Sequence, residues 1–165
     1  MTTTMTTTAR RILAALMTVG ALSVAAPGIA HAGESCHTID ARGTGQQTGP
    51  TTTVATIRGG GLLTGRTVGD FPDAVPTDGG LLIAGTVTFT GGGATLAVDV
   101  EGTLTFTDPP GSLTFDVTST DMAGTGRLAG VDSGVSHLRL AGVGAPDGSF
   151  TETVTGEICI GHPPR

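Results

Sequence analysis

The sequence predicts an all-β fold whose strands follow one another as an antiparallel meander, and two observations support this prediction. Residues 79–160 alternate apolar and polar side chains with a period of two, the spacing of a strand with one buried and one solvated face. Breaks rich in glycine and proline interrupt the alternation, as turns do between consecutive hairpins. Although the chain contains 28 glycines, regular alternation of this kind argues against disorder.

Residues 1–32 are predicted to be an export signal, with a signal-peptide helix that lies outside the mature fold. Arg10 and Arg11 precede an apolar run of 15 residues at 12–26, and residues 30–32 form a small-x-small cleavage site. The run is shorter than the roughly 20 residues that span a bilayer. The arginines match a twin-arginine signal only loosely, and no cysteine marks a lipid anchor. We therefore expect residues 33–165 to form one secreted, extracellular domain without a transmembrane segment.

The charge balance excludes some classes of function. The chain has 8 basic and 14 acidic residues, so without Arg10 and Arg11 the balance is 6 against 14, a net charge of −8. We expect no nucleic-acid binding and poor affinity for phosphate. The chain contains no lysine for a Schiff base and no asparagine for N-linked glycosylation. No cofactor is expected.

The two cysteines, Cys36 and Cys159, lie near the two ends of the predicted domain. In an exported chain this placement favours a disulfide that joins the first strand to the last. The alternative is a redox or metal pair, which His37 and His162 would extend to a Cys2His2 set. There is no Cys-x-x-Cys motif, and both histidines are predicted to lie on the surface, so we expect no metal site.

Residues 38–78 are less regular. Strands are predicted at 51–58 and 61–68, and a loop at 69–78 because that segment contains two prolines and three aspartates. Asp70, Asp73 and Asp78 could supply carboxylate ligands for calcium. Their spacing does not fit an EF-hand, and the alternative is a solvated acidic loop.

The second half predicts five strands. The first three, at 83–90, 95–107 and 112–118, are separated by a glycine turn at 91–93 and an Asp-Pro-Pro-Gly turn at 108–111. The last two, at 135–143 and 149–160, flank a turn at 144–148. The segment Gly-Thr-Gly-Arg-Leu-Ala-Gly, at residues 124–130, lies between the first three strands and the last two. This motif lacks the βαβ context of a nucleotide-binding loop, and in an all-strand chain such glycines mark bulges or tight corners.

The C-terminal part of the chain resembles the C-terminal half of allene oxide cyclase and dirigent-type barrels. The resemblance lies in the motif at 124–130, the strand after it, the Pro-Asp-Gly turn and the final Phe-Thr-x-Thr-Val-Thr-Gly strand. It is greatest to small secreted bacterial proteins related to those barrels. The resemblance covers residues 79–160. It implies an eight-stranded antiparallel β-barrel, which agrees with two or three strands before residue 79 and about five after it. Closure would leave no exposed sheet edge. The alternative is a β-sandwich of two sheets.

The resemblance also implies two activities, cyclisation of an unsaturated fatty-acid epoxide and guidance of the radical coupling of phenols inside the barrel. Dirigent-type pockets use Asp, Arg and Tyr side chains. This chain has no tyrosine, whereas Arg127 matches the arginine of the motif.

Glu152 is the polar residue that the alternation singles out. In the last strand it shares a face with Phe150, Val154, Gly156 and Ile158. A carboxylate on an apolar face is costly to ionise, so its pKa should rise. Such a group suits a general acid or a polar contact for a ligand. Alternatively, Glu152 lies near the barrel mouth, or a bulge reverses the phase, and the side chain is solvated.

The strand before it is predicted to point Leu138 and Leu140 inward. His137 and Arg139 then lie outside, near Asp99, Glu101 or Asp116, where cross-strand charge pairing is their expected role. Ser133 or Ser136, His137 and Asp132 cannot form a catalytic triad, because neighbours on one strand lack the geometry and no nucleophile elbow is present.

Two functions follow from the sequence. The first is a noncatalytic exported barrel that holds a small apolar ligand or is simply a stable domain, since eight strands enclose room for side chains or one small ligand. The second is a cyclase or isomerase acting on a lipid-like or phenolic substrate, with Glu152 and Arg127 as the polar groups. The distinguishing observation is whether a buried Glu152 touches a second polar group in a cavity.

Overall fold

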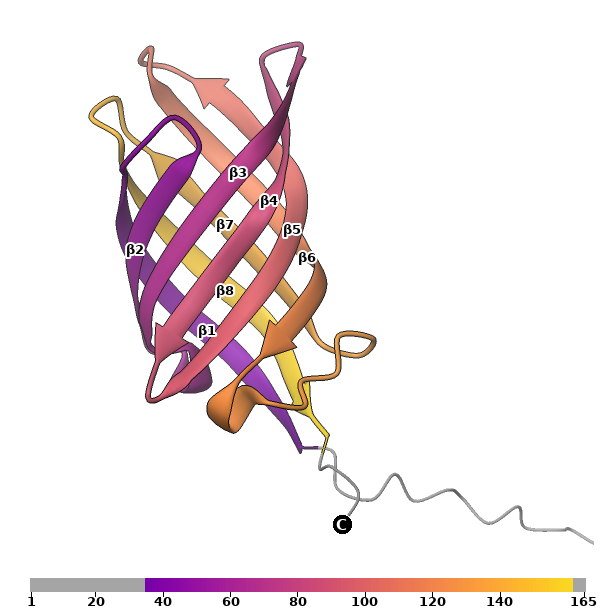
Figure 1. Ribbon diagram of the computed structural model, residues 1–165. Coiled ribbons are helices and arrows are strands. Elements are labelled where there is room, and N and C mark those ends of the chain that lie inside the picture. Colours follow the sequence, from indigo (N-terminus) through magenta and orange to yellow (C-terminus); the bar gives the residue numbers. More distant parts are fainter. Residues whose placement is uncertain (1–34, 162–165) are drawn as a thin grey trace, which may run out of the picture. The chain divides into compact units, whose positions relative to one another are not determined.

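The computed structural model describes residues 35–161, so the predicted export signal at 1–32 and His162 lie outside the described residues. The described chain is a closed barrel in which every strand pairs antiparallel with the next and β8 pairs with β1 (Figure 1). The elements are β1 (Ser35–Gln47), β2 (Thr52–Arg58), η1 (Gly61–Leu63), β3 (Gly65–Thr77), β4 (Gly80–Gly91), β5 (Ala94–Thr107), β6 (Ser112–Gly124), η2 (Gly126–Leu128), β7 (His137–Gly144) and β8 (Ser149–Ile160). The predicted eight-stranded barrel is confirmed, and the sandwich alternative is wrong.

The strand count agrees with the sequence prediction, with three strands before residue 79 and five after it. The last strand has the predicted bounds, 149–160, and the strands predicted at 51–58 and 95–107 are each found within one residue. Strand β6 is longer than predicted because it continues past residue 118 to Gly124, with Thr120 as an extra residue between the pairs Val100–Ser119 and Asp99–Asp121. A bulge of this kind bends the strand and adds twist.

The loop predicted at residues 69–78 is wrong, because β3 runs on to Thr77 and pairs with β4 as far as Gly80. Strand β2 pairs with β3 only as far as Asp70, so the rest of β3 has no strand partner on that edge. Pro72 and Pro76 lie along this edge segment. Proline is tolerated in a strand where its missing N–H would have had no partner.

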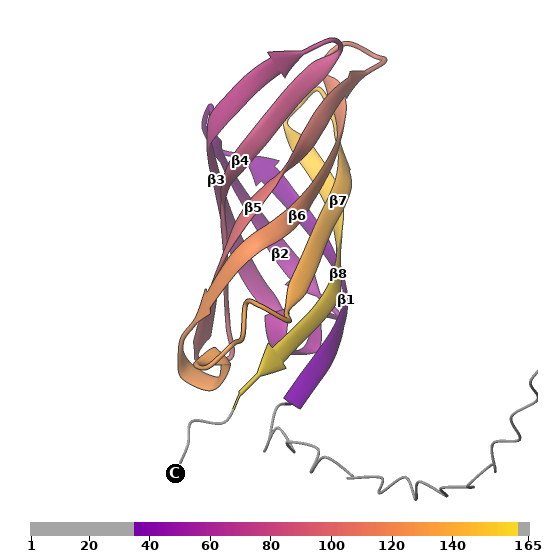
Figure 2. The same cartoon turned by 90° about the vertical axis from the view of Figure 1, so that its right-hand side faces the viewer.

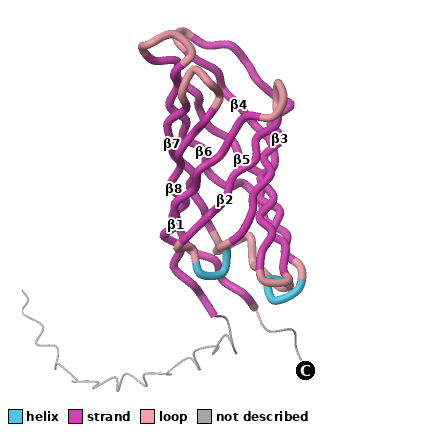
Figure 3. Tube along the Cα trace, turned by 90° about the vertical axis from the view of Figure 1, so that its left-hand side faces the viewer, coloured by secondary structure: helices cyan, strands magenta, loops and turns pink. Residues whose placement is uncertain are grey.

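The strand predicted at residues 61–68 begins later, at Gly65. The preceding Gly61–Leu63 is the short 3₁₀ helix η1, and Gly61 has a φ of 54°. Helices η1 and η2 lie at the same end of the barrel (Figure 3). Each buries one leucine, Leu63 and Leu128, both 2% exposed. These two side chains join the core and plug this end of the barrel.

The core fills the plugged end of the barrel. Its inward-facing side chains from the strands, together with the two plug leucines, include Ile39, Ile57, Leu63, Phe89, Leu96, Val98, Leu128, Leu138, Leu140, Val154 and Ile158. The first residue of β1 and the last of β8 lie side by side at this end (Figure 2). Inward alternation on every strand produces this core, because the pleat sends every second side chain to the same face.

Towards the other end the inward-facing side chains are less buried. Leu104, Leu113, Phe115 and Phe150 are only half-buried, and Phe106 is 56% exposed. This end is formed by the β1–β2, β3–β4, β5–β6 and β7–β8 turns, with no helix to cover it. We call it the open end. Among residues 35–161, no helix is long and apolar enough to cross a membrane.

Candidate functional site

Glu152 points into the barrel, three residues from the open end of β8. It is 8% exposed, and its strand neighbours Thr151 and Thr153 are exposed on the outer face. Its cross-strand partners are both glycines, Gly43 on β1 and Gly142 on β7. A Cβ built on Gly43 would lie only 2.6 Å from Oε1 of Glu152. The carboxyl group therefore occupies space that a side chain at position 43 would fill.

Two aromatic residues neighbour Glu152 on the inner face of the barrel. Phe150 precedes Glu152 on the same face of β8, and its ring covers Gly45, where a built Cβ would lie 2.3 Å from Cζ. The ring of Phe115 covers Gly142 in the same way, at 2.6 Å. The two rings meet edge to face with their centroids 6.0 Å apart, a favoured aromatic geometry. Glycine backbone, phenylalanine rings and the Ile57 side chain therefore surround Glu152.

Burial in these apolar surroundings raises the pKa of Glu152 to about 7. Within residues 35–161 the carboxyl group has no hydrogen-bond or ion-pair partner, and no fully buried side-chain oxygen is left unpaired. The carboxyl oxygens therefore keep contact with solvent. The alternative in which a bulge turns Glu152 outward is wrong. Near neutral pH this group exchanges a proton, and it can donate or accept a hydrogen bond.

Three other carboxyl groups have pKa values that shift the opposite way. The pKa of Asp116 is lowered by the Arg139 guanidinium, that of Asp121 by Ser133 and the N–H of Met122, and that of Asp147 by the hydroxyl and N–H of Ser149. All three are hydrogen-bonded near solvent and stay ionised at neutral pH. Their contacts hold strands and turns in place, which sets them apart from Glu152.

Arg127 lies at the plugged end, in η2. Its Nη2 donates a hydrogen bond of 3.0 Å to the carbonyl of Leu62 in η1, and its guanidinium packs on Gly92 in the β4–β5 turn. Glu152 is near the opposite end of β8, and burial alone accounts for its pKa. The structure does not bring Arg127 and Glu152 together. The 124–130 motif, which connects β6 to β7, thus contacts the β2–β3 and β4–β5 connections and positions Leu128 at the plugged end.

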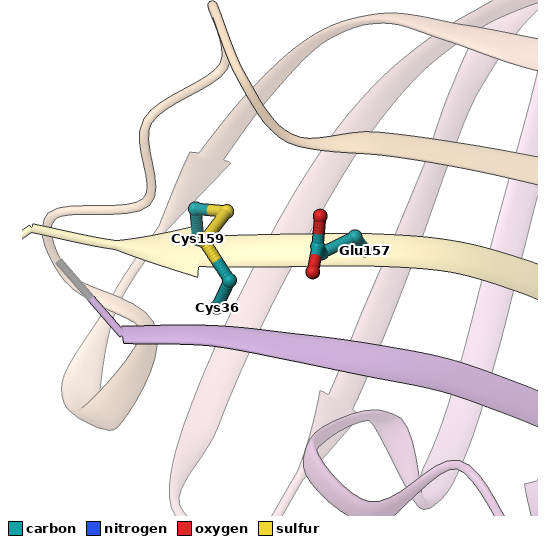
Figure 4. Close-up of side chains that lie close together, drawn as sticks. All are labelled: Cys36, Glu157 and Cys159. Carbon is teal, nitrogen blue, oxygen red and sulfur yellow. A yellow bond between two sulfur atoms is a disulfide. The ribbon is translucent and has the colours of Figure 1, made fainter.

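Cys36 and Cys159 form the predicted disulfide, with their sulfur atoms bonded at 2.04 Å and their Cα atoms paired directly across β1 and β8. The Glu157 carboxylate lies beside them on β8 (Figure 4), and all three side chains are close enough to surround an ion. Sulfurs that are bonded to each other cannot act as thiolate ligands. In this oxidised form the cluster is a covalent staple across the strand pair that closes the barrel.

The predicted outward pairing of Arg139 is confirmed, because its guanidinium binds Asp116 through two hydrogen bonds, of 2.8 and 2.5 Å. His137 is exposed, and His37 is exposed and lies 3.2 Å from the Ser35 hydroxyl. The triad excluded from the sequence does not form within the described residues. Ser136 bonds the backbone of Cys159, and Asp132 accepts the N–H of Gly134.

The sequence prediction missed the pair of glycines beside Glu152. Gly43 lies 109 residues before Glu152 in the sequence, and Gly142 lies ten residues before it. Only the pairing registers of β1 with β8 and of β7 with β8 place these glycines on either side of Glu152. The period-two phase of each strand was a usable signal, since positions 43 and 142 both lie on inward faces. The register itself is not written in the alternation.

Comparison of the chain with protein-family models, with curated proteins and with solved structures finds no match.

Proposed function

We propose that this protein is an exported, noncatalytic barrel that binds a small, largely apolar ligand at its open end and contacts one polar group of that ligand through Glu152. The observation that carries the proposal is a mostly buried carboxyl group that no protein group within residues 35–161 bonds. Its oxygens reach solvent at the open end, so a polar group of a ligand can replace water as their hydrogen-bond partner. The half-buried rings would cover the ligand's apolar part.

Three further features support this proposal. Leu63 and Leu128 plug one end of the barrel, so a ligand would enter from the other. The disulfide is compatible with an oxidising, extracellular compartment, in line with the predicted export signal. Eight strands enclose enough width for one small ligand and no more.

The first experiment is native mass spectrometry of the protein purified from culture medium, before and after denaturation, with analysis of the lipid extract. We expect a stoichiometric small molecule that denaturation releases. The neutral fluorophore N-phenyl-1-naphthylamine then serves as a probe for titration. Glu152→Gln should lower the affinity for the retained ligand by about tenfold, which corresponds to the loss of one hydrogen bond to a charged group.

Glu101→Gln is the matched control, because Glu101 lies on the outer, exposed face of β5. Equal affinities for the wild type and both variants would show that Glu152 does not contact the ligand. A clean apo mass together with no saturable probe binding would refute the binding function itself.

The second candidate is a cyclase or isomerase of the allene oxide cyclase or dirigent type. The observation that favours it is the pKa of Glu152, which suits proton transfer near neutral pH. Catalysis needs at least two positioned groups, and no second polar side chain among residues 35–161 bonds this carboxyl. Incubation with an unsaturated fatty-acid epoxide or a phenol, followed by chiral chromatography, tests it. Turnover that Glu152→Gln abolishes would favour the enzyme over the binding protein.

A further inference from the structure

The outer face of β1, β2 and β3 gathers positive charge on a chain with a net charge of −6. Arg42, Arg58 and Arg66 lie on these three consecutive strands, one on each, and all three are exposed. Their strand positions have the outward phase, since the residues next to them, such as Ile57 and Thr67, are buried. We call Arg42, Arg58 and Arg66 the arginine face.

The strand register places these arginines next to one another. Arg42 and Arg58 are direct partners across the β1–β2 ladder. Arg66 is the partner of Thr56, which is two residues from Arg58 on the same outer face. Directly opposed residues have Cβ atoms roughly 5 Å apart and diagonal neighbours roughly 7–8 Å apart. The fold thus holds three like charges near one another with one carboxylate, Asp40, beside them, so positive charge is in excess at this place.

Among residues 35–161, no carboxylate forms an ion pair with the arginine face, and Asp40 is the acidic residue that lines the same hollow as Arg42 and Arg58. The other two arginines in the described part of the chain are engaged, Arg139 with Asp116 and Arg127 with the Leu62 carbonyl. By contrast, the arginine face makes no ion pair with any residue from 35 to 161.

Two adjoining hollows lie on the same outer face. The first, of about 490 Å³, is lined by Arg42 and Arg58, with Asp40 in its wall. The second, of about 410 Å³, is lined by Arg66. Thr44 and Thr56 line both hollows, so the two share a wall of threonine side chains. The arrangement offers guanidinium groups at two places and hydroxyl donors between them.

We propose that the arginine face binds a small oxyanion that carries two or more negative groups. One group lies between Arg42 and Arg58, where two guanidinium groups can each donate to it, and a second group reaches Arg66. Guanidinium groups bind carboxylate and phosphate oxygens through short, charge-assisted hydrogen bonds. The acidic net charge predicts poor affinity for phosphate, but net charge does not describe how charge is distributed over a surface.

This site is independent of the proposed ligand site. Gly43 and its neighbours on β1 separate the two, because Glu152 packs on the inner side of this strand and the arginines lie on its outer side. Loss of one site therefore leaves the other unaffected, and failure of one proposal does not decide the other.

Isothermal titration calorimetry of the purified protein at low ionic strength tests the proposal, with inorganic tripolyphosphate as the probe and monophosphate as its single-group counterpart. We expect tripolyphosphate to bind at least tenfold more tightly than monophosphate, and Arg58→Gln to weaken it by about tenfold. A second titration, with citrate, distinguishes carboxylate from phosphate as the preferred group. The probe that binds with the higher affinity identifies that group.

Arg139→Gln is the matched control, because it removes the same charge from the outer face of β7 and leaves the arginine face intact. Its affinity should equal that of the wild type. Equal weakening by both variants would mean that only net charge matters and would overturn the proposal. Binding of tripolyphosphate no tighter than monophosphate, or no saturable binding of tripolyphosphate or citrate, would overturn it as well.

Discussion

Glu152 shows how strongly its neighbours determine the chemistry of one side chain. Glu101 and Glu152 are both strand residues, yet Glu101 faces solvent and Glu152 faces glycine backbone and two aromatic rings. Removal from water disfavours the charged form and raises the pKa of Glu152. A group with this pKa is protonated in about half of the molecules at neutral pH.

The first prediction concerns the pH dependence of stability. The pKa of Glu152 is about 7 in the folded state and about 4.3 in the unfolded chain. Between these values the folded state binds more protons, so the free energy of unfolding falls as the pH rises. The difference in unfolding free energy between Glu152→Gln and the wild type should therefore shift by about 2–3 kcal/mol in favour of the variant from pH 5 to pH 8. Urea denaturation at both pH values measures this difference.

Glu101→Gln is the control for this measurement and should follow the wild-type pH profile. A wild-type profile parallel to that of Glu152→Gln between pH 5 and pH 8 would show that the carboxyl group titrates at its ordinary pKa and is solvated in the folded protein.

At the scale of elements, the pairing of β1 with β2 brings together two like charges that lie 16 residues apart, at Arg42 and Arg58. Alternation alone places each arginine on an outer face, and that part of the arrangement is readable from the sequence. The like-charge contact depends on the register of the β1–β2 pair, which alternation alone does not specify. The same dependence explains why the prolines of β3 predict a loop, since the edge that tolerates them is free only because β2 ends its pairing at Asp70.

The second prediction concerns this strand pair. Arg58→Gln should stabilise the folded protein by a few tenths of a kcal/mol, because like charges directly opposite one another are destabilising. Thermal unfolding at low and high salt measures the effect. The gain should shrink at high salt, where the repulsion is screened. A loss of stability at low salt would show that Arg58 makes a favourable contact in the unliganded protein.

At the scale of the whole molecule, closure depends on the pairing of β8 with β1, since these strands come from the two ends of the described chain. Twelve residue pairs join them, from Ser35–Ile160 to Gln46–Ser149. The disulfide spans the same seam and links residues 123 positions apart. Closing so long a loop restricts the unfolded chain far more than a local crosslink would.

The third prediction follows from this crosslink. The double variant Cys36→Ser with Cys159→Ser should lose about 4–5 kcal/mol of unfolding free energy in the loop-entropy model. Urea denaturation of the oxidised wild type and the double variant gives the difference. Far-ultraviolet circular dichroism of the variant should still report strands, because the strand ladder is intact without the sulfur bond. A difference below about 1 kcal/mol would contradict the loop-entropy account.

The all-β class, the inward phase of most strands and the cysteine pair follow from the amino-acid sequence, which also places Glu152 on an apolar face but leaves a solvated position open. These properties depend on local alternation and on turn residues, which act over a few positions. The pairing of the strands in the folded barrel is what buries Glu152 between two glycines, brings Arg127 to the plugged end and gathers three arginines on one outer face. Each of these depends on which strands pair and in what register, and that choice is made by packing around the closed barrel, where residues distant in sequence become neighbours.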